Sequence, residues 1–425
     1  MRRSNLSDRI GCIARIAIMA VGLALHLGAP GYAADPPLPL LAKGEAVDWW
    51  FVFKFNATSF RGCKGDAKRS CPFGGGKPNT AYGNSYSQQY VFASSKDPKL
   101  KEGEGCAGDT TKDPIGATFG EIYNGDYYYV VWNDQFDDHP KIPGCSGTCS
   151  APWGHSKGMV AWNEAGDGIV IQVSTPSWPG SGSKDFERDG DGNSLGCTKR
   201  NNVKFSQHFF ALRLDKSDLM KVLEALRNAS VATNPKNEPN ELMRTGGPPE
   251  VQALARRLGS KSDSMKYTKE ELSSKVIVIS KPSSLNVPPW QMVSALLGQE
   301  PLRVATWWGH NKIYSTTPSS RVTCWDGTLD RPGPVEIAIT GQWEDGTDFK
   351  LTSGANHAKI GISDSGDHHY AIFGDMNQEG ALLQKNDCTT SQNGRGGLFF
   401  AINNEPLHKS ISKLLQGKAA GTKSK

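Results

Sequence analysis

An ordered internal repeat constrains the fold of this 425-residue chain more than any other feature of its sequence. A His-x-Lys pair opens an apolar run at residues 155–157 and again at 357–359, and a Phe-Phe-Ala segment occurs at 208–212 and again at 398–402. The offsets are 202 and 190 residues, each close to half of the chain. One short match arises often by chance, whereas an ordered series of matches indicates two related halves.

Each half combines strands with a helix. Apolar residues recur at helical spacing after each Phe-Phe-Ala segment, over residues 218–226 and 407–415. A third, weaker echo relates residues 47–53 to 304–308. Strands followed by a helix in both halves predict a fold of the α/β class, of mixed α+β type, with sheets faced by helices.

The domain boundaries follow from composition. We expect a leader at residues 1–33, a first half at 34–232 and a second half at 233–417, with the boundary inside the proline-rich stretch 228–250. The last segment, 418–425, holds lysines among small residues and is expected to be a disordered basic tail.

The leader has the pattern of a secretory signal peptide. Four arginines precede an apolar run at residues 16–27, and the small-residue segment 31–33 follows. This predicts a secreted or periplasmic protein, and no later apolar run is long enough for a membrane-spanning helix. Without residues 1–33 the formal net charge falls from +5 to +2. A bound polyanion must therefore be held by a local patch and not by the overall field.

The cysteines favour disulfides. Nine are present, and eight remain once Cys12 leaves with the leader, an even number that suits an exported chain. Cys324 and Cys388 are isolated in the second half, so we expect them to pair. Cys145 and Cys149 have the spacing of half a zinc site, but no second pair matches it, and a disulfide is the better interpretation.

The His-x-Lys pairs are the candidate chemical groups. Residues i and i+2 of a strand point to one face, so His155 and Lys157 project side by side, as do His357 and Lys359. One such pair is usually a solvated strand surface. Two copies at equivalent points of a repeat favour one shared cleft, because a twofold relation between the halves brings them together.

Two imidazoles and two ammonium groups suit the cleavage of a phosphodiester without a metal. The ammonium groups neutralise charge on the phosphoryl oxygens. One neutral imidazole attacks phosphorus and forms a phosphohistidine, while the other, protonated, donates to the leaving alkoxide and later activates water. Imidazole has a pKa of ~6.5, so both forms are accessible. The requirement for one neutral and one protonated imidazole predicts a bell-shaped pH profile of activity on the acidic side.

Several short stretches extend the pattern beyond the two pairs. They are Val47-Asp48-Trp49 with Lys54, Trp132-Asn133-Asp134-Gln135, Gly154-His155-Ser156-Lys157-Gly158, Asn356-His357-Ala358-Lys359, Gly374-Asp375-Met376-Asn377 and Arg395-Gly396-Gly397. In this order they resemble the deoxyribonuclease II family of the phospholipase D superfamily. The second half is also similar to the superfamily signature H-x-K-x4-D, which ends here at Asp364, followed by G-S-x-N.

The resemblance implies a fold, an activity and a site. The fold is a phospholipase D-like pseudo-dimer that forms a U-shaped clamp around duplex DNA. The activity is an endonuclease that needs no metal or other cofactor and leaves 3′-phosphate and 5′-hydroxyl ends. The catalytic residues that it implies are His155, Lys157, His357 and Lys359. The residues that it implies as supporting or phosphate-binding are Asp364, Asp375, Asn377 and Arg395.

The sequence departs from the family pattern in three respects. Trp162 stands where the first half would carry the signature Asp, and Ala358 and Ile360 replace the usual Ser and aromatic residue of the second pair. Asp375 replaces the Ser of G-S-x-N. We expect its side chain to orient an imidazole or pair with a lysine, and Arg395 to contact phosphate or cap a turn.

Other interpretations stay open. A phospholipase D-like phosphodiesterase acting on lipid or another diester has the same chemistry, and a non-catalytic secreted nucleic-acid-binding protein could keep the fold. Both His-x-Lys pairs are present, which counts against a silent scaffold. Residues 189–193 fail the EF-hand pattern and residues 367–369 are expected at a hairpin tip, so no metal site is predicted. The tryptophans of two apolar runs are expected in the core; these are Trp49, Trp50, Trp307 and Trp308.

Overall fold

The protein is described from a computed structural model. It describes residues 35–56, 59, 89–108, 110–136, 142–145, 147–186, 205–344, 346–364 and 366–422, all within one compact unit, residues 34–425. The expected leader, the loop at 189–193 and the last three residues of the tail lie outside the described residues.

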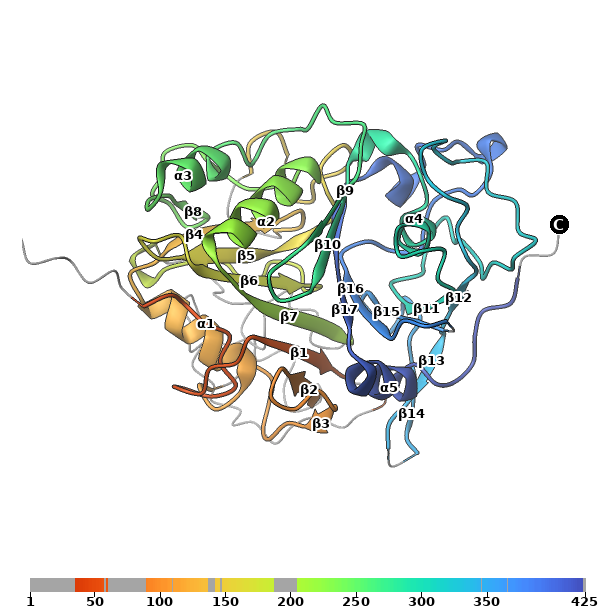
Figure 1. The fold of residues 1–425 in the computed structure, drawn as a ribbon, viewed down its shortest axis with the longest axis horizontal. Coiled ribbons are helices and arrows are strands. Elements are labelled where there is room, and N and C mark those ends of the chain that lie inside the picture. Colours follow the sequence, from red (N-terminus) through yellow and green to blue (C-terminus); the bar gives the residue numbers. More distant parts are fainter. Residues whose placement is uncertain are drawn as a thin grey trace, which may run out of the picture. The chain divides into compact units, whose positions relative to one another are not determined.

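Within the described residues, strands form two large, mainly antiparallel sheets and a small hairpin, and helices accompany them, so the protein is of mixed α/β type (Figure 1). The first sheet has eight strands in the order β3 (Lys101–Glu102), β2 (Tyr90–Ser94), β1 (Trp49–Lys54), β7 (Gln207–Leu214), β6 (Gly168–Val173), β5 (Lys157–Trp162), β4 (Tyr128–Asn133) and β8 (Met243–Arg244). The second has seven, in the order β12 (Val335–Ile337), β11 (Leu302–Ala305), β15 (Ile360–Ser363), β16 (Tyr370–Gly374), β17 (Gly397–Asn403), β10 (Ile277–Lys281) and β9 (Thr268–Glu271). All pairs are antiparallel except β11 with β12, and the hairpin joins β13 (Thr340–Gln342) to β14 (Asp348–Lys350).

The two sheets share an order of five strands. In the first sheet β4, β5, β6 and β7 follow one another, and the earlier strand β1 pairs beside β7. In the second, β11, β15, β16 and β17 follow one another, and the earlier strand β10 pairs beside β17. The strongest echoes therefore occupy matching places, with the His-x-Lys pairs at β5 and β15 and the Phe-Phe-Ala segments at β7 and β17.

The weaker echo does not follow this order. Residues 47–53 include most of β1, which lies beside a Phe-Phe-Ala strand, whereas residues 304–308 include the end of β11, which lies beside a His-x-Lys strand. The strand that matches β1 is β10. Similar runs of apolar residues arise in any buried strand, so that echo was a chance similarity.

The two sheets face one another across a shared core. Alternate side chains of β1, including Phe51 and Phe53, point into this core, while Trp50 and Val52 point to the opposite face. Phe51 stacks on Phe373 of β16 with ring centroids 4.5 Å apart. Aromatic contacts of this kind join the two sheets directly.

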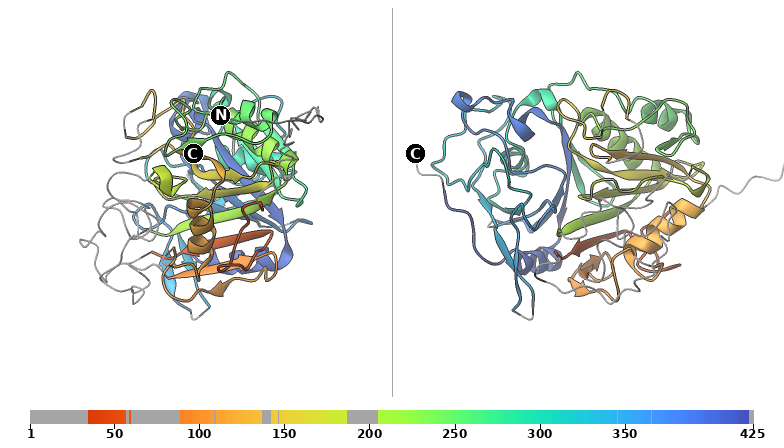
Figure 2. Two further views of the ribbon diagram at one scale, coloured as in Figure 1. Left: turned by 90° about the vertical axis from the view of Figure 1, so that its left-hand side faces the viewer. Right: turned by 180° about the vertical axis from the view of Figure 1, so that it is seen from behind.

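Helices α2 (Lys216–Asn228) and α5 (Glu405–Leu414) complete the shared core, as the helical spacing predicted. Each begins at a side chain that caps its first turn, Asp215 for α2 and Asn404 for α5. Helix α1 (Pro114–Asn124) covers the outer face of the first sheet, and α4 (Pro289–Leu296) covers that of the second (Figure 2).

The chain passes from the first sheet to the second after the expected boundary at residue 232. Strand β8 pairs with β4 in the first sheet, and helix α3 (Pro249–Ala255) packs with α2. The second sheet begins only at β9. Residues 418–422, expected in a disordered tail, form β-bridges through Ala419 and Thr422, because their backbone groups meet partners at Ala338 and Ser315.

The described cysteines confirm the disulfide interpretation. Cys324 bonds to Cys388, as predicted, and Cys145 bonds to Cys149 instead of forming part of a zinc site. Cys106 is also disulfide-bonded. Among the helices of the described part of the chain, none has the length and apolar character that crossing a bilayer requires.

Candidate active site

Both His-x-Lys pairs lie at the start of a strand in the middle of a sheet. Lys157 is the first residue of β5, and Lys359 directly precedes β15. One cavity of about 350 Å³ is lined by both pairs. Its lining residues are Gln135, His155, Lys157, Ser174, Pro176, Phe205, Trp307, His357, Lys359 and Asn377. The structure thus brings together the four residues predicted as catalytic.

Each histidine is anchored by a segment of the opposite sheet. The backbone N–H of His155 donates to the Gly396 carbonyl at 2.8 Å, and that of His357 donates to the Ser206 carbonyl at 2.8 Å. Gly396 directly precedes β17, and Ser206 directly precedes β7. A Cβ on Gly396 would lie 2.1 Å from the carbonyl oxygen of Ala229, so only glycine fits this close approach.

The His155 ring is oriented by the backbone of the second sheet. Its Nδ1 lies 2.8 Å from the carbonyl oxygen of Asp375. A carbonyl can only accept, so Nδ1 must carry the proton and Nε2 keeps the lone pair when the ring is neutral. This arrangement is suited to a nucleophile, because the free lone pair is fixed on the other side of the ring.

The His357 ring lies instead between aromatic side chains. It stacks on Phe205 with centroids 4.4 Å apart and an interplanar angle of 5°. Trp307 meets it edge-on at 4.5 Å. The two imidazoles therefore have different surroundings, although their strands occupy matching places in the sheets.

Both imidazoles favour the neutral form in the free protein. Burial lowers the pKa of His155 well below its ordinary value, and the nearby Lys157 lowers it further. Burial likewise lowers the pKa of His357, with Lys359 as the next cause. A bound phosphodiester would oppose these effects, because its negative charge favours imidazolium.

The first lysine is held by a carboxylate. Lys157 Nζ forms an ion pair with Oδ1 of Asp134, and both side chains are buried. Burial alone would raise the pKa of Asp134, but Lys157, His155 and Arg395 outweigh it and hold that pKa well below its usual range. Asp134 is therefore a fixed negative charge beside the cavity.

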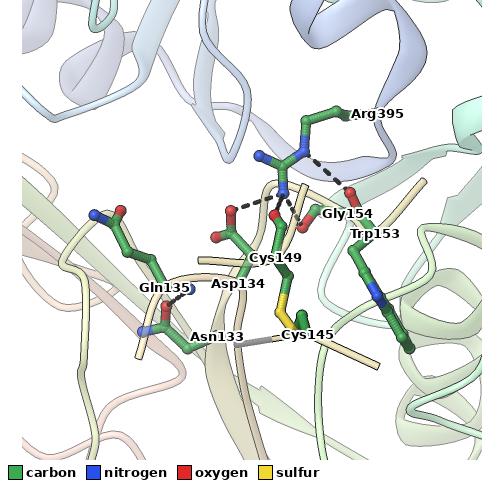
Figure 3. The surroundings of a disulfide bond; sticks show 8 residues. All are labelled: Asn133, Asp134, Gln135, Cys145, Cys149, Trp153, Gly154 and Arg395. Carbon is green, nitrogen blue, oxygen red and sulfur yellow. Dashed lines mark hydrogen bonds and ion pairs between the residues drawn. A yellow bond between two sulfur atoms is a disulfide. The ribbon is translucent and has the colours of Figure 1, made fainter. Parts of the chain in front are cut away.

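Arg395 holds the same carboxylate from the second half of the chain (Figure 3). Its Nη2 donates to Asp134 Oδ2 at 2.8 Å and to the carbonyls of Cys149 and Gly154, and its Nε donates to the carbonyl of Trp153. Arg395 does not line the cavity. Its contacts join the 149–154 segment, next to the Cys145 disulfide, to the approach to β17.

The second lysine has a different environment. Lys359 Nζ donates to the carbonyl of His357 at 2.7 Å, and its backbone N–H donates to Nδ1 of His208 at 3.1 Å. Among the described residues, Lys359 has no carboxylate partner within ion-pair distance. Burial lowers its pKa to about 7, and Lys157 contributes to this shift.

The predicted supporting residues are dispersed. Asn377 lines the cavity, and its Nδ2 donates to Glu379 at 3.3 Å. Asp375 is buried behind His155, where burial raises the pKa of its carboxyl to about 7 and its Oδ2 accepts the Leu398 N–H at 3.1 Å. It meets His155 through its backbone carbonyl, and not through the carboxylate that we expected to orient an imidazole or pair with a lysine.

Asp364 does not reach the cavity. It is exposed and follows the last residue of β15, five positions beyond Lys359. An extended strand advances about 3.3 Å per residue, which puts roughly 16 Å between the two backbones. The signature spacing is present, but the strand carries this carboxylate away from the site.

Sequence reasoning missed several lining or supporting residues. Trp49, Trp50 and Trp308 are buried as expected, but Trp307 lines the cavity. His208, at the start of β7, is buried against Lys359. Its place before a Phe-Phe-Ala strand gave no signal of a role, because the matching position of the repeat is Leu398.

The described part of the chain contains no group of three or more His, Cys, Asp or Glu side chains arranged to hold a metal ion. His368, in the predicted hairpin tip, pairs with Glu300 at 2.8 Å.

Comparison with known proteins gives the family of the chain. No curated protein matches the chain. A sequence model of the family described as deoxyribonuclease II matches residues 40–418, which include both His-x-Lys pairs and every described helix and strand. The chain therefore belongs to the deoxyribonuclease II family.

Proposed function

We propose that this protein is an exported endodeoxyribonuclease that cleaves DNA phosphodiesters without a divalent metal, through a phosphohistidine. Membership of the deoxyribonuclease II family supports a deoxyribonuclease. The observation that carries the mechanism is the convergence of both His-x-Lys pairs on one cavity. The catalytic residues of the proposal are His155, Lys157, His357 and Lys359.

His155 is the nucleophile of this mechanism. Its Nδ1 proton is held by the Asp375 carbonyl, and its lowered pKa keeps Nε2 unprotonated. Nε2 attacks phosphorus, a P–N bond forms, and the bond from phosphorus to the 5′-oxygen breaks. The DNA 3′-phosphoryl group is then attached to His155.

His357 is the general acid and then the general base. As imidazolium it donates its proton to the departing 5′-oxygen, which leaves as a hydroxyl. The neutral ring then takes a proton from water as that water attacks phosphorus and breaks the P–N bond. The products are a 3′-phosphate, a 5′-hydroxyl and free His155. Because its pKa is lowered, the acid step is favoured at acidic pH.

The lysines neutralise the phosphoryl oxygens. Lys157 is fixed by Asp134, whereas Lys359 has no carboxylate partner among the described residues and is the better placed to meet the phosphate. Asn377 is the third polar group of the second half that lines the cavity.

The substrate is proposed to be duplex DNA, held in a U-shaped clamp made by two related halves. The common order of five strands in the two sheets supports a pseudo-dimer. Export is supported by the signal-like pattern of residues 1–33 and by the two described disulfides, which persist in oxidising compartments.

Plasmid digestion tests the proposal. The chain from residue 34 is incubated with plasmid in EDTA between pH 4 and pH 8, and the ends are identified. We expect cleavage with an acidic optimum and 3′-phosphate ends, lost in His155→Asn and His357→Asn. Strict dependence on magnesium would refute the mechanism. Cleavage of lipid or other diesters but not DNA would favour a phospholipase D-like enzyme, and DNA binding without cleavage a silent binding protein.

A further inference from the structure

A second cavity lies outside the catalytic site, in the long connection between β11 and β12. Its volume is about 370 Å³, and among the described residues it shares no lining residue with the catalytic cavity. The side chains that matter for its chemistry are a half-buried indole, two exposed guanidinium groups and two hydroxyls. They belong to Trp325, Arg321, Arg331, Thr317 and Ser320.

Internal bonds hold the walls of this cavity in place. Cys324, next to Trp325, is joined to Cys388 by a disulfide. The indole N–H of Trp325 donates to the Leu329 carbonyl at 3.3 Å. Arg331 donates from one guanidinium nitrogen to the Pro318 carbonyl, which leaves other N–H groups of its five for a ligand.

The charges that line the cavity are of one sign. Arg321 and Arg331 are its only charged lining residues among those described. The connection also contains Asp326 and Asp330, but neither lines the cavity, and Asp326 accepts the N–H of Thr328 at 2.8 Å. A ligand with anionic oxygens and a flat apolar face would satisfy the two guanidinium groups and the indole.

We propose that this cavity binds a flanking nucleotide of the DNA strand that the catalytic site cleaves. The two arginines bind backbone phosphate, and Trp325 stacks on a base that is unpaired beyond the duplex at the catalytic site, the combination that sequence-tolerant single-strand sites use. The inference rests on the proposed function, since it takes DNA as the substrate, and adds a second contact on the same strand.

The path between the two cavities is short enough for one continuous DNA strand to reach both. The Leu382 carbonyl accepts the N–H of Thr323 at 2.7 Å and of Cys324 at 2.9 Å. Leu382 is five residues after Asn377 of the catalytic cavity, a span of at most about 18 Å in a fully extended chain. A duplex strand advances about 3.4 Å per nucleotide. The hydrogen bond to Cys324 and the step from Cys324 to Trp325 add about 7 Å, so the second contact falls within roughly eight nucleotides of Asn377.

Two substrates separate this site from the catalytic one. One is a fluorescently labelled DNA 20-mer with a central duplex and single-stranded overhangs, and the other is thymidine 3′-(4-nitrophenyl phosphate), which is too short to reach the second cavity. The variants are Arg321→Gln with Arg331→Gln, Trp325→Ala and Trp325→Phe. The matched control, Arg257→Gln with Lys261→Gln, removes the same two charges from exposed residues elsewhere.

We expect the double arginine variant to raise KM for the 20-mer about 10-fold and to reduce the slope of log KM against log salt by about 1.4, for two lost phosphate contacts. Trp325→Ala should raise KM about 10-fold, with rescue by Trp325→Phe. Turnover of the short diester should not change.

If the variants have the same KM and salt slope as the control, the proposal is wrong. It is also wrong if they lose activity equally on both substrates, because that indicates a misfolded loop. Binding of the labelled 20-mer, measured by fluorescence anisotropy, is read separately from cleavage. If the wild type cleaves only the short diester, the proposed DNase activity fails. In that case weaker binding of the 20-mer by these variants than by the control still supports the second site, and equal binding refutes it.

Discussion

Arg395 Nη2 donates to Oδ2 of Asp134 at 2.8 Å across 261 positions of the sequence. The other oxygen of the same carboxylate pairs with Lys157, so one buried anion lies between cations from the two halves. Burying a charge is costly unless it is paired. Each of the three side chains therefore depends on the other two, and the first His-x-Lys pair is held in place only when the approach to β17 is also in place.

Asp134→Asn tests this dependence. The change leaves Lys157 and Arg395 without their counter-charge, and removing one partner of a buried pair costs roughly 3–5 kcal/mol. We expect the free energy of unfolding in urea at pH 7 to fall by about that amount, and the cleavage rate to fall with it. Asp364→Asn is the control, because Asp364 is exposed, and should change stability by less than about 0.5 kcal/mol. Equal stability of Asp134→Asn and wild type would contradict the pairing.

The acid dependence of stability should change in the same variant. The folded-state pKa of Asp134 lies below the value of about 3.9 that it has in the unfolded chain. Its contribution is therefore fully present well above that unfolded value and is lost as pH falls towards the folded one. Wild type should lose stability steeply below about pH 4, and Asp134→Asn less steeply. Parallel curves, measured by urea unfolding at each pH, would count against this role.

Lys359→Arg tests which lysine binds the phosphoryl group. The Lys359 pKa is lowered to about 7, so the ammonium charge is present below that pH and lost above it, whereas arginine stays charged. Sulfate keeps its charge across this range. We expect competitive inhibition by sulfate to weaken above pH 7 in wild type and to persist in Lys359→Arg. A wild-type inhibition constant that is flat from pH 6 to pH 9 would contradict the assignment.

Gly396→Ala tests how His155 is anchored. The added methyl would lie 2.1 Å from the Ala229 carbonyl oxygen, so the segment must move and weaken the bond from the His155 N–H. We expect a loss of about 1–3 kcal/mol of stability and at least a 10-fold lower kcat. Gly354→Ala is the control, because its added Cβ meets nothing within 4 Å although it lies near His357. Similar behaviour of the two variants would remove the steric argument.

Local periodicity was enough to predict part of this site. Residues i and i+2 of any strand share a face, which placed the pairs at 155–157 and 357–359 beside each other on strands; in the structure only Lys157 lies within its strand, and the other three residues lie just before β5 and β15. The same holds for the helices, where leucines such as Leu223 and Leu414 recur at helical spacing. Two similar offsets then predicted that the pairs would meet, which the shared cavity confirms.

The remaining features depend on contacts that no local pattern encodes. Asp134 is paired because Arg395 of the other half contacts it, and no sequence pattern near either residue predicts this ion pair. The Asp375 carbonyl orients His155, and every residue has such a carbonyl. Trp307 was expected in the core because it continues an apolar run, but β11 ends at Ala305 and the chain then turns into the cavity.

His357→Asn and His155→Asn should separate the two histidines on a substrate that needs no acid. In thymidine 3′-(4-nitrophenyl phosphate) the leaving group departs as a stabilised anion, so attack by His155 can proceed without a proton from His357. Hydrolysis of the phosphohistidine still needs a base to activate water. We therefore expect His357→Asn to release one nitrophenolate per chain in a rapid burst and then turn over slowly, with the thymidine 3′-phosphoryl group retained on His155. His155→Asn should give no burst, because it lacks the nucleophile. A burst from His155→Asn and none from His357→Asn, recorded by stopped-flow absorbance, would exchange the two roles.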